Sequence, residues 1–121
     1  MIRNPFRGRW RITEMEQWDR EYRDLVVPAF IEFNARESGE FQFGTVRGWM
    51  DCRFGSREGR PLVEFSWDGQ SDEDPGCGRG WAELAGGQLR GMIFIHGSDD
   101  SSFVAKRSQA RLAKRHERPG R

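Results

Sequence analysis

Branched aliphatic residues are scarce in this sequence, and no apolar run is long enough to cross a membrane as a helix. Leucine, isoleucine and valine account for only fifteen of the 121 residues, whereas nine phenylalanines and five tryptophans supply much of the apolar bulk. The core is therefore predicted to be rich in aromatic side chains. Residues 1–11 contain no apolar signal region, so the sequence predicts neither a secretion signal nor a membrane partner.

Residues that bind metals or act as nucleophiles are also few. The only cysteines are Cys52 and Cys77, and nothing marks them as a pair. A structural zinc site needs about four ligands at close spacing, which the sequence does not offer. The acids at residues 72–74 lack the alternating oxygen ligands and closing glutamate of an EF-hand loop. We therefore predict no metal and no cofactor, and the unpaired cysteines favour a cytoplasmic location.

Polar and apolar residues alternate in seven segments, which is the pattern of β-strands with two different faces. These segments are residues 8–16, 29–34, 40–54, 62–68, 79–84, 89–96 and 102–107. Gly44 and Gly48 interrupt the third segment, which is therefore either one bent strand or two strands. Most of the segments are joined by short turns, but residues 69–78 are predicted to form an acidic loop.

A different spacing follows the first predicted strand. Trp18, Tyr22 and Leu25 recur at the interval of one helix face, which predicts a short helix over residues 17–25. The sequence thus predicts a mainly β domain over residues 1–107. Its expected fold is a single antiparallel, up-and-down, barrel-like meander of seven or eight strands with one short helix after the first strand. Such a meander tends to close, because closure removes unpaired strand edges.

The end of the chain is strongly cationic. From Lys106 onward, seven lysines and arginines accompany one acid, Glu117, whereas the first 105 residues carry 13 cations and 18 acids. Residues 108–121 are predicted to be a disordered basic tail, since they have too few apolar residues to form a core. Weak, nonspecific contact with nucleic acid or another anionic surface is one expected use of this tail, and a solvated chain end is the alternative.

Three residues at the two ends of the predicted domain form a pattern found in a known group of proteins. The first strand opens with Gly8, any residue and Trp10, and Arg107 ends the last strand. In this respect the chain resembles the calycin or lipocalin-like small barrels, which open with Gly-x-Trp and carry an arginine or lysine over that tryptophan. The resemblance implies a barrel in which Arg107 packs on Trp10. A cation over an indole ring contributes roughly 0.5–2 kcal/mol.

The body of the chain also resembles a group of short bacterial proteins of unknown function. The runs that carry this resemblance are residues 8–12 with 15–16, 65–67, 78–82 and 99–103. Together they extend over nearly the whole predicted domain. This second resemblance supports the expected fold and implies no activity.

Two of the predicted strands have a charged face. These faces are formed by Arg47, Asp51 and Arg53 on one strand and by Glu64, Ser66 and Asp68 on the next. Alternation alone does not say whether they point into the barrel, where they would line a polar cavity, or outward as a wet surface. Burying several incompletely paired charges is costly, so the outward placement is favoured, with the aromatic side chains inside.

Trp49 and Trp81 fall on the same faces as these charged residues. An exposed tryptophan among charges is a candidate contact for a ligand or a partner, and packing on the outer face of the sheet is the alternative. The candidate contact residues are Trp49, Trp81, Arg47, Arg53, Glu64 and His96. No catalytic residue is predicted, because His96 lacks an evident oriented partner and no nucleophile motif surrounds it.

Three hypotheses about function follow. The favoured one is a non-catalytic binding module that contacts a small molecule or a protein through a pocket or rim. The first alternative is a structural or interaction protein with a filled core, whose outer face and basic tail contact a partner. The second alternative is a small acid–base enzyme with its site in the barrel mouth. A cavity inside the barrel would favour the first hypothesis, and a filled core the second.

Overall fold

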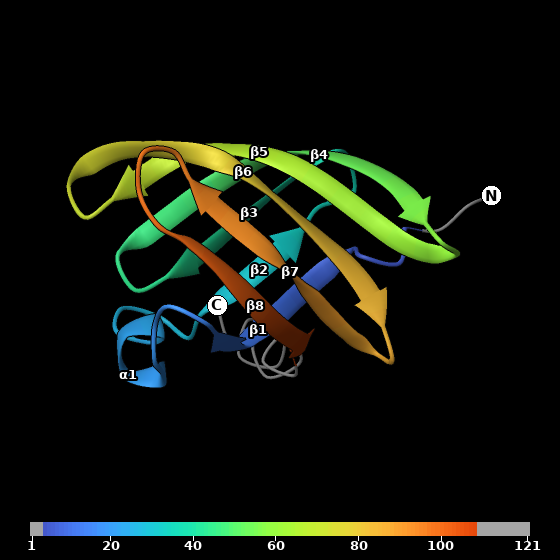
Figure 1. The fold of residues 1–121 in the computed structure, drawn as a ribbon, viewed down its shortest axis with the longest axis horizontal. Helices are drawn as coiled ribbons and strands as arrows, with labels where there is room; N and C mark the ends of the chain where they lie inside the picture. The colour runs from blue at the N-terminus through green and yellow to red at the C-terminus, as the bar shows by residue number, and fades with distance from the viewer. Residues whose placement is uncertain (1–3, 109–121) are drawn as a thin grey trace, which may run out of the picture.

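A computed structural model describes residues 4–108, and in this range the chain forms a closed barrel of eight antiparallel strands (Figure 1). The strands are β1 (Gly8–Met15), β2 (Phe30–Phe33), β3 (Ser38–Phe43), β4 (Val46–Arg57), β5 (Arg60–Ser71), β6 (Asp74–Ala85), β7 (Gln88–Ile95) and β8 (Asp100–Arg107). A short helix, α1 (Arg20–Arg23), lies between β1 and β2. Each strand pairs with its neighbour in the chain, and β1 also pairs with β8. The predicted fold class is confirmed.

The barrel has two ends, which carry different parts of the chain (Figure 1). The helix end consists of α1 and the turns between β3 and β4, β5 and β6, and β7 and β8. The terminal end consists of the turns between β2 and β3, β4 and β5, and β6 and β7, together with residues 4–7 and Ser108. In the view of Figure 1 the helix end lies to the left and the terminal end to the right.

The structure gives the boundaries of two predicted elements, the third alternating segment and the short helix. The third alternating segment is two strands, β3 and β4, and Gly44 in the turn between them has a φ of +57° that glycine adopts readily. The helix is shorter than the predicted range of residues 17–25. Asp19 caps it, since its carboxylate accepts a hydrogen bond of 3.1 Å from the Tyr22 N–H.

The prediction of an acidic loop over residues 69–78 is wrong. β5 continues to Ser71 and β6 begins at Asp74, so only a tight turn separates two strands of twelve residues each. Asp72 has a φ of +59°, a conformation that aspartate tolerates better than most residues. Its carboxylate accepts a hydrogen bond of 2.8 Å from the Thr45 hydroxyl, which ties this turn to the one between β3 and β4.

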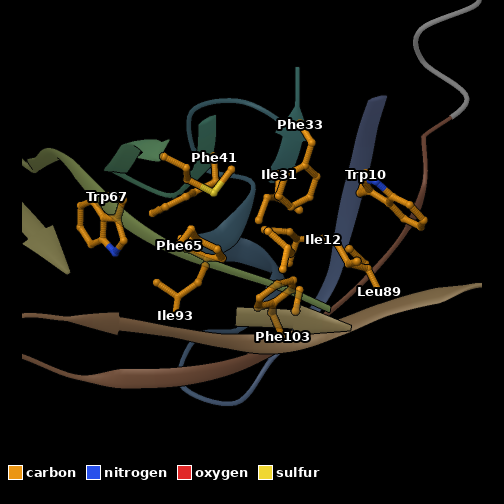
Figure 2. Close-up of a cluster of buried hydrophobic side chains, with 14 of the residues drawn as sticks. Trp10, Ile12, Ile31, Phe33, Phe41, Phe65, Trp67, Leu89, Ile93 and Phe103 are labelled. Carbon is orange, nitrogen blue, oxygen red and sulfur yellow. The ribbon is translucent and has the colours of Figure 1, made fainter. Parts of the chain in front are cut away.

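The interior of the barrel is packed with apolar side chains. Figure 2 shows Trp10, Ile12, Ile31, Phe33, Phe41, Phe65, Trp67, Leu89, Ile93 and Phe103 within this cluster, and all ten are buried. Glycines on the same inner face make room for the rings. A methyl group at Gly48 would stand 2.5 Å from the Phe41 ring and 2.8 Å from the Trp67 ring. Alternation of small and large residues around the wall therefore lets the aromatic core fill the barrel.

Phe6 closes the barrel at the terminal end. Its side chain is buried, and its ring lies 5.6 Å from that of Phe33, centroid to centroid. The indole N–H of Trp10 donates a hydrogen bond of 2.9 Å to the Phe6 carbonyl. Arg107 donates to the carbonyls of Pro5 (2.7 Å) and Arg7 (2.6 Å). The chain that precedes β1 is thus folded over the barrel mouth and held there from both sides.

The same arginine provides the contact that the sequence resemblance implies. The Arg107 guanidinium carbon lies 4.1 Å from the centroid of the Trp10 ring, and the two residues are partners in the β1–β8 ladder. The first and last strands therefore meet where the sequence placed them.

Arg23 and the chain around α1 close the helix end. The β1–β8 register shifts between Ile12 and Glu14, so Thr13 forms a bulge in the ladder. The buried guanidinium of Arg23 donates to the Thr13 carbonyl (2.8 Å) and to the Trp18 carbonyl (3.4 Å). The Trp18 ring in turn packs 4.9 Å from that of Phe43. Both mouths of the barrel are therefore covered.

The domain boundary and the tail can be compared with the structure only in part. The last strand ends at Arg107, and residues 109–121 of the predicted tail lie outside the described residues. In the part of the chain that the structure describes, no helix has the length and apolar character needed to cross a membrane.

Candidate functional site

The charged faces of β4 and β5 point outward. Val63, Phe65 and Trp67 are buried, whereas Glu64 and Asp68 between and beyond them are exposed. The same alternation runs through β4. The outward placement expected from the cost of burying charge is therefore the one observed, and any polar site lies on the outer wall of the barrel rather than inside it.

Three of the six candidate residues lie side by side on this wall. The strand registers place Arg53 opposite Glu64, and Glu64 opposite Trp81, in one row across β4, β5 and β6. Side chains directly opposite one another in antiparallel strands have Cβ atoms roughly 4.5–5.5 Å apart. The row borders an open concavity of about 420 Å³. Its other lining residues are Asp51, Phe65, Ser66, Arg79, Gly80 and Phe94.

The charges around this concavity, which we call the Trp81 concavity, alternate in sign. Asp51 and Arg53 form an exposed ion pair with 3.2 Å between the carboxylate oxygen and the guanidinium nitrogen. Glu64 follows on the next strand and Arg79 on the one after. An exposed pair of this kind contributes little to stability because water screens it and its side chains lose entropy. These groups are thus free to exchange their mutual contacts for contacts with a partner.

Trp81 itself is partly covered by an arginine that the sequence did not associate with it. The Arg57 guanidinium carbon lies 5.1 Å from the Trp81 ring centroid, and a guanidinium nitrogen lies 3.8 Å from a Glu83 carboxylate oxygen. Residues 55–60 fall between two of the predicted strands, yet β4 and β5 include four of these six residues. Extending the alternation of β4 to Arg57 would have placed it on the outer face with Arg53.

Arg47 and Trp49 form a second, separate arginine–aromatic pair. The Arg47 guanidinium carbon lies 4.9 Å from the Trp49 ring centroid, and Trp49 is 46% exposed. Arg47 also pairs with Glu40 at 3.6 Å. Arg53 lies four positions after Trp49 along β4, a span of roughly 13 Å in an extended strand. The structure therefore divides the six candidate residues and does not gather them into one site.

His96 occupies a third place, just after β7. Its backbone N–H donates to the Cys77 carbonyl at 2.8 Å, so the two residues are neighbours across β6 and β7. Both are exposed, and they line an open concavity of about 660 Å³ that also includes Arg79 and Asp100. Among residues 4–108, no three histidine, cysteine or acidic side chains converge as metal ligands would.

A further concavity of about 790 Å³ was not anticipated from the sequence. It crosses the outer face from β8 to β4. Five cations and one acid line it: Arg9, Arg11, Arg47, Lys106, Arg107 and Glu40. Phe30 is part of its surface, beneath the Arg9 guanidinium carbon at 3.9 Å from the ring centroid. Three of the five cations already have acidic partners within 4 Å, so this surface is only moderately cationic.

Two groups have pKa values displaced by their surroundings, and neither belongs to a reactive arrangement. Burial, assisted by the nearby Asp51 carboxylate, raises the pKa of the Cys52 thiol to about 12. This thiol is therefore inert in the folded protein. Partial burial by itself would raise the pKa of Asp24. The hydrogen bond from the Ala29 N–H and the charge of Arg11 outweigh this effect, and the pKa lies below its ordinary value.

Comparisons of the chain with protein-family models, with curated proteins and with solved structures found no match. The fold is therefore assigned as a closed antiparallel barrel and no more narrowly. The residues on the outer wall of this barrel are the basis for its function.

Proposed function

We propose that the protein is a non-catalytic binding module that contacts its partner through the Trp81 concavity on the outer wall. The observation that carries this proposal is the single row of Arg53, Glu64 and Trp81 across three strands, beside Asp51 and Arg79. Tryptophan and arginine are the residues most enriched among the energetically dominant positions of interfaces. The alternating charges beside them supply directional contacts that select a partner.

The partner is proposed to be a protein rather than a small molecule. A small-molecule site usually encloses most of its ligand, which an open depression of about 420 Å³ does not do. The interior, where small barrels such as lipocalins hold a ligand, is occupied by the aromatic cluster, and Phe6 and Arg23 cover its two mouths. These features support contact at the surface.

The mode of contact follows from the closed topology. Each strand has two neighbours, and β5 and the part of β6 around Trp81 are paired on both sides, so a partner finds no free strand edge to extend there. Recognition therefore depends on side chains, in particular on the half-buried Trp81 ring and the charged groups on either side of it. The partner segment is expected to present an aromatic or aliphatic residue flanked by charges of both signs.

The relationship to calycin-like barrels and the cytoplasmic location are part of the same proposal. The Arg107–Trp10 contact across the β1–β8 ladder supports calycin-like membership. The unpaired and exposed Cys77 thiol supports a reducing compartment, where such a thiol persists. A carrier function does not follow from this relationship, because the filled interior favours surface binding.

The proposal is tested by selecting short random peptides on the immobilised full chain and measuring the affinity of the enriched sequences by isothermal titration calorimetry. Peptides that bind the wild type should lose about tenfold or more in affinity for Arg53→Glu/Trp81→Ala, since interface tryptophans often contribute over about 1.4 kcal/mol. Arg47→Glu/Trp49→Ala is the matched control, because it removes the same residue types elsewhere on the wall.

Two outcomes would contradict the proposal. One is a selection that enriches no peptide. The other is a set of peptides that bind both double variants as well as the wild type. Thermal unfolding of each variant accompanies the titrations, and Glu64→Arg serves as a second probe of the row because its side chain is exposed and its replacement disturbs no core contact.

A further inference from the structure

The charged residues of the barrel are separated by sign between its two ends. We count the turns, the chain segments beyond the strands and the last two residues of each strand. At the helix end there are ten acids and three cations. The acids are Glu14, Glu16, Asp19, Glu21, Asp24, Asp72, Glu73, Asp74, Asp99 and Asp100, and the cations are Arg20, Arg23 and Arg47.

At the terminal end the balance is reversed. Counted in the same way, it has seven cations and three acids. The cations are Arg7, Arg9, Arg36, Arg57, Arg60, Lys106 and Arg107, and the acids are Glu32, Glu37 and Glu58. All seven cations except the half-buried Arg9 are exposed. The overall net charge of +1 therefore conceals a strongly polarised molecule.

The topology explains why this separation was not visible along the chain. The cations come from five places: the segment before β1, the start of β1, the turn between β2 and β3, the strand ends beside the turn between β4 and β5, and the end of β8. An up-and-down barrel brings alternate turns to the same end. The chain also continues from Ser108, at this end, into residues 109–121, whose sequence adds five cations and one acid.

We infer that the terminal end binds the phosphate backbone of nucleic acid without regard to base sequence. Six of its seven cations are arginines, whose planar guanidinium groups match phosphate oxygens in pairs. The cations Arg9, Lys106 and Arg107 also line the 790 Å³ concavity, so the basic surface continues from the rim onto the wall. Binding of this kind draws its free energy from the release of counterions and needs no shaped pocket.

The side chains of the terminal end favour nucleic acid over other anionic partners. A protein interface needs a desolvated apolar centre, and a membrane surface needs apolar groups to insert. The large exposed apolar side chains of residues 4–108 are Leu25, Val26 and Trp49, and none of them belongs to the terminal end. The absence of exposed rings there also predicts no base stacking, and hence no preference of the barrel for single strands.

The test measures binding of the full chain to two short DNA duplexes of unrelated sequence by fluorescence anisotropy. The affinities for the two duplexes should agree within about twofold. If about four phosphates are contacted, the affinity should fall roughly 100-fold between about 50 and 200 mM salt. The charge reversals Arg36→Glu/Arg60→Glu should weaken binding at low salt by about tenfold or more, since both residues are exposed at the terminal end.

The matched control is Arg20→Glu, which lies at the helix end and changes the net charge as much as the single variant Arg36→Glu at the terminal end. This control should retain affinity within about threefold of the wild type, because charges beyond a Debye length of about 10 Å are largely screened. Equal losses in Arg20→Glu and Arg36→Glu would overturn the inference, since net charge alone would then explain binding. Unchanged affinity of Arg36→Glu/Arg60→Glu would also overturn it, as would failure of the wild type to bind at low salt.

The same assay separates the other anionic partners. Polyglutamate and phosphatidylserine vesicles are added as competitors at equal charge concentration, and tighter binding to either one overturns the assignment to nucleic acid. A concentration-dependent increase in molecular mass at low salt, lost in Arg36→Glu/Arg60→Glu but kept in Arg20→Glu and insensitive to DNA, would mean that the basic end binds the acidic end of a second copy. That result also overturns the assignment. The residues changed here, Arg20, Arg36 and Arg60, lie outside the Trp81 concavity, so the proposed protein-binding site stands or falls separately.

Discussion

At the terminal end Arg107 donates hydrogen bonds to two backbone carbonyls, and at the helix end Arg23 does the same. The surroundings of the two arginines differ. Arg107 is exposed, stacks on Trp10, and holds a segment whose Phe6 is buried in the core. Arg23 is buried and donates a hydrogen bond to the carbonyl of Thr13, the residue at the strand bulge. One mouth is thus closed mainly by aromatic burial, and the other by a polar network.

Because the two ends of the barrel are closed by different interactions, they should respond differently to a change in pH. Burial of Phe6 and Trp10 involves no titratable group, so the terminal end should be indifferent to pH. The network at the helix end includes Asp24, which accepts hydrogen bonds from the Ala29 N–H (2.9 Å) and from Arg11 (2.7 Å). A carboxylate in this position makes the helix end sensitive to acid.

The largest effect is expected at the terminal end. Trp10→Ala should reduce the free energy of unfolding by about 3–5 kcal/mol, because it leaves a large cavity in the core. Arg107→Ala should cost less, and the double variant less than the sum of the two, because the residues share one contact. Urea unfolding of the four proteins in this cycle measures the coupling.

The control for this cycle combines Trp10→Ala with Arg47→Ala, whose guanidinium stacks on Trp49. The effects of these two changes should add, since distant sites rarely interact. Additive effects in the Trp10–Arg107 cycle as well would show that the stacking of Arg107 on Trp10 contributes nothing to stability.

A smaller effect is expected from Arg23→Met at the helix end. Methionine keeps the apolar stem but leaves the Thr13 and Trp18 carbonyls without their donor, which should cost about 1–3 kcal/mol. Arg20→Met on the same helix is the control and should change stability by less than about 0.5 kcal/mol, because Arg20 is exposed. Equal unfolding midpoints for the two variants would mean that the hydrogen bonds of Arg23 do not stabilise the helix end.

The dependence of stability on pH should reveal Asp24. Because its pKa is lower in the folded protein than in the unfolded chain, folding is favoured where the carboxylate is ionised in both states. This contribution is present above about pH 4 and is lost as the pH falls through the lower, folded-state value. Urea unfolding at neutral and at acidic pH should show a smaller loss for Asp24→Asn than for the wild type. A loss of the same size in both proteins would contradict this assignment.

The smallest effect is expected on the rates at which the two cysteines are labelled, which report how often the barrel opens. Cys77 is exposed and should react with a thiol reagent at once, whereas Cys52 is buried with a pKa near 12 and should react only when the barrel opens. Because the Cys52 N–H donates to the Glu37 carbonyl in a terminal-end turn, Phe6→Ala should accelerate its labelling more than Arg23→Met does. Mass spectrometry at successive times gives both rates, and equal acceleration would mean that the ends open together.

The sequence was sufficient for the strands whose two faces differ sharply. Val63, Phe65 and Trp67 alternate with polar residues so regularly that the inner face and the aromatic core could be predicted. The pairing of Trp10 with Arg107 was accessible through a resemblance, since two residues at opposite ends of a chain carry no local signal of contact.

What could not be predicted depends on tertiary geometry. The strand ends around Asp72 are polar on both faces and lie beyond the core, so no apolar alternation marked them as strands. For the same reason the approach of Arg57 to Trp81 was missed. The candidate residues were drawn from two strand faces, but their division into separate places depends on register, which a period of two leaves open.

The ladder between β1 and β8 has a consequence for how the chain must fold. Seven of the eight pairings join strands that follow each other directly and can zip up one after another from the amino-terminal side. The eighth pairs β1 with β8 and joins positions as far apart in the chain as Trp10 and Arg107, so one edge of β1 has no partner until the last strand exists. Before β8 pairs with it, this edge of β1 is exposed. At that stage a newly made chain is most susceptible to wrong strand pairing, as in domain exchange with another copy.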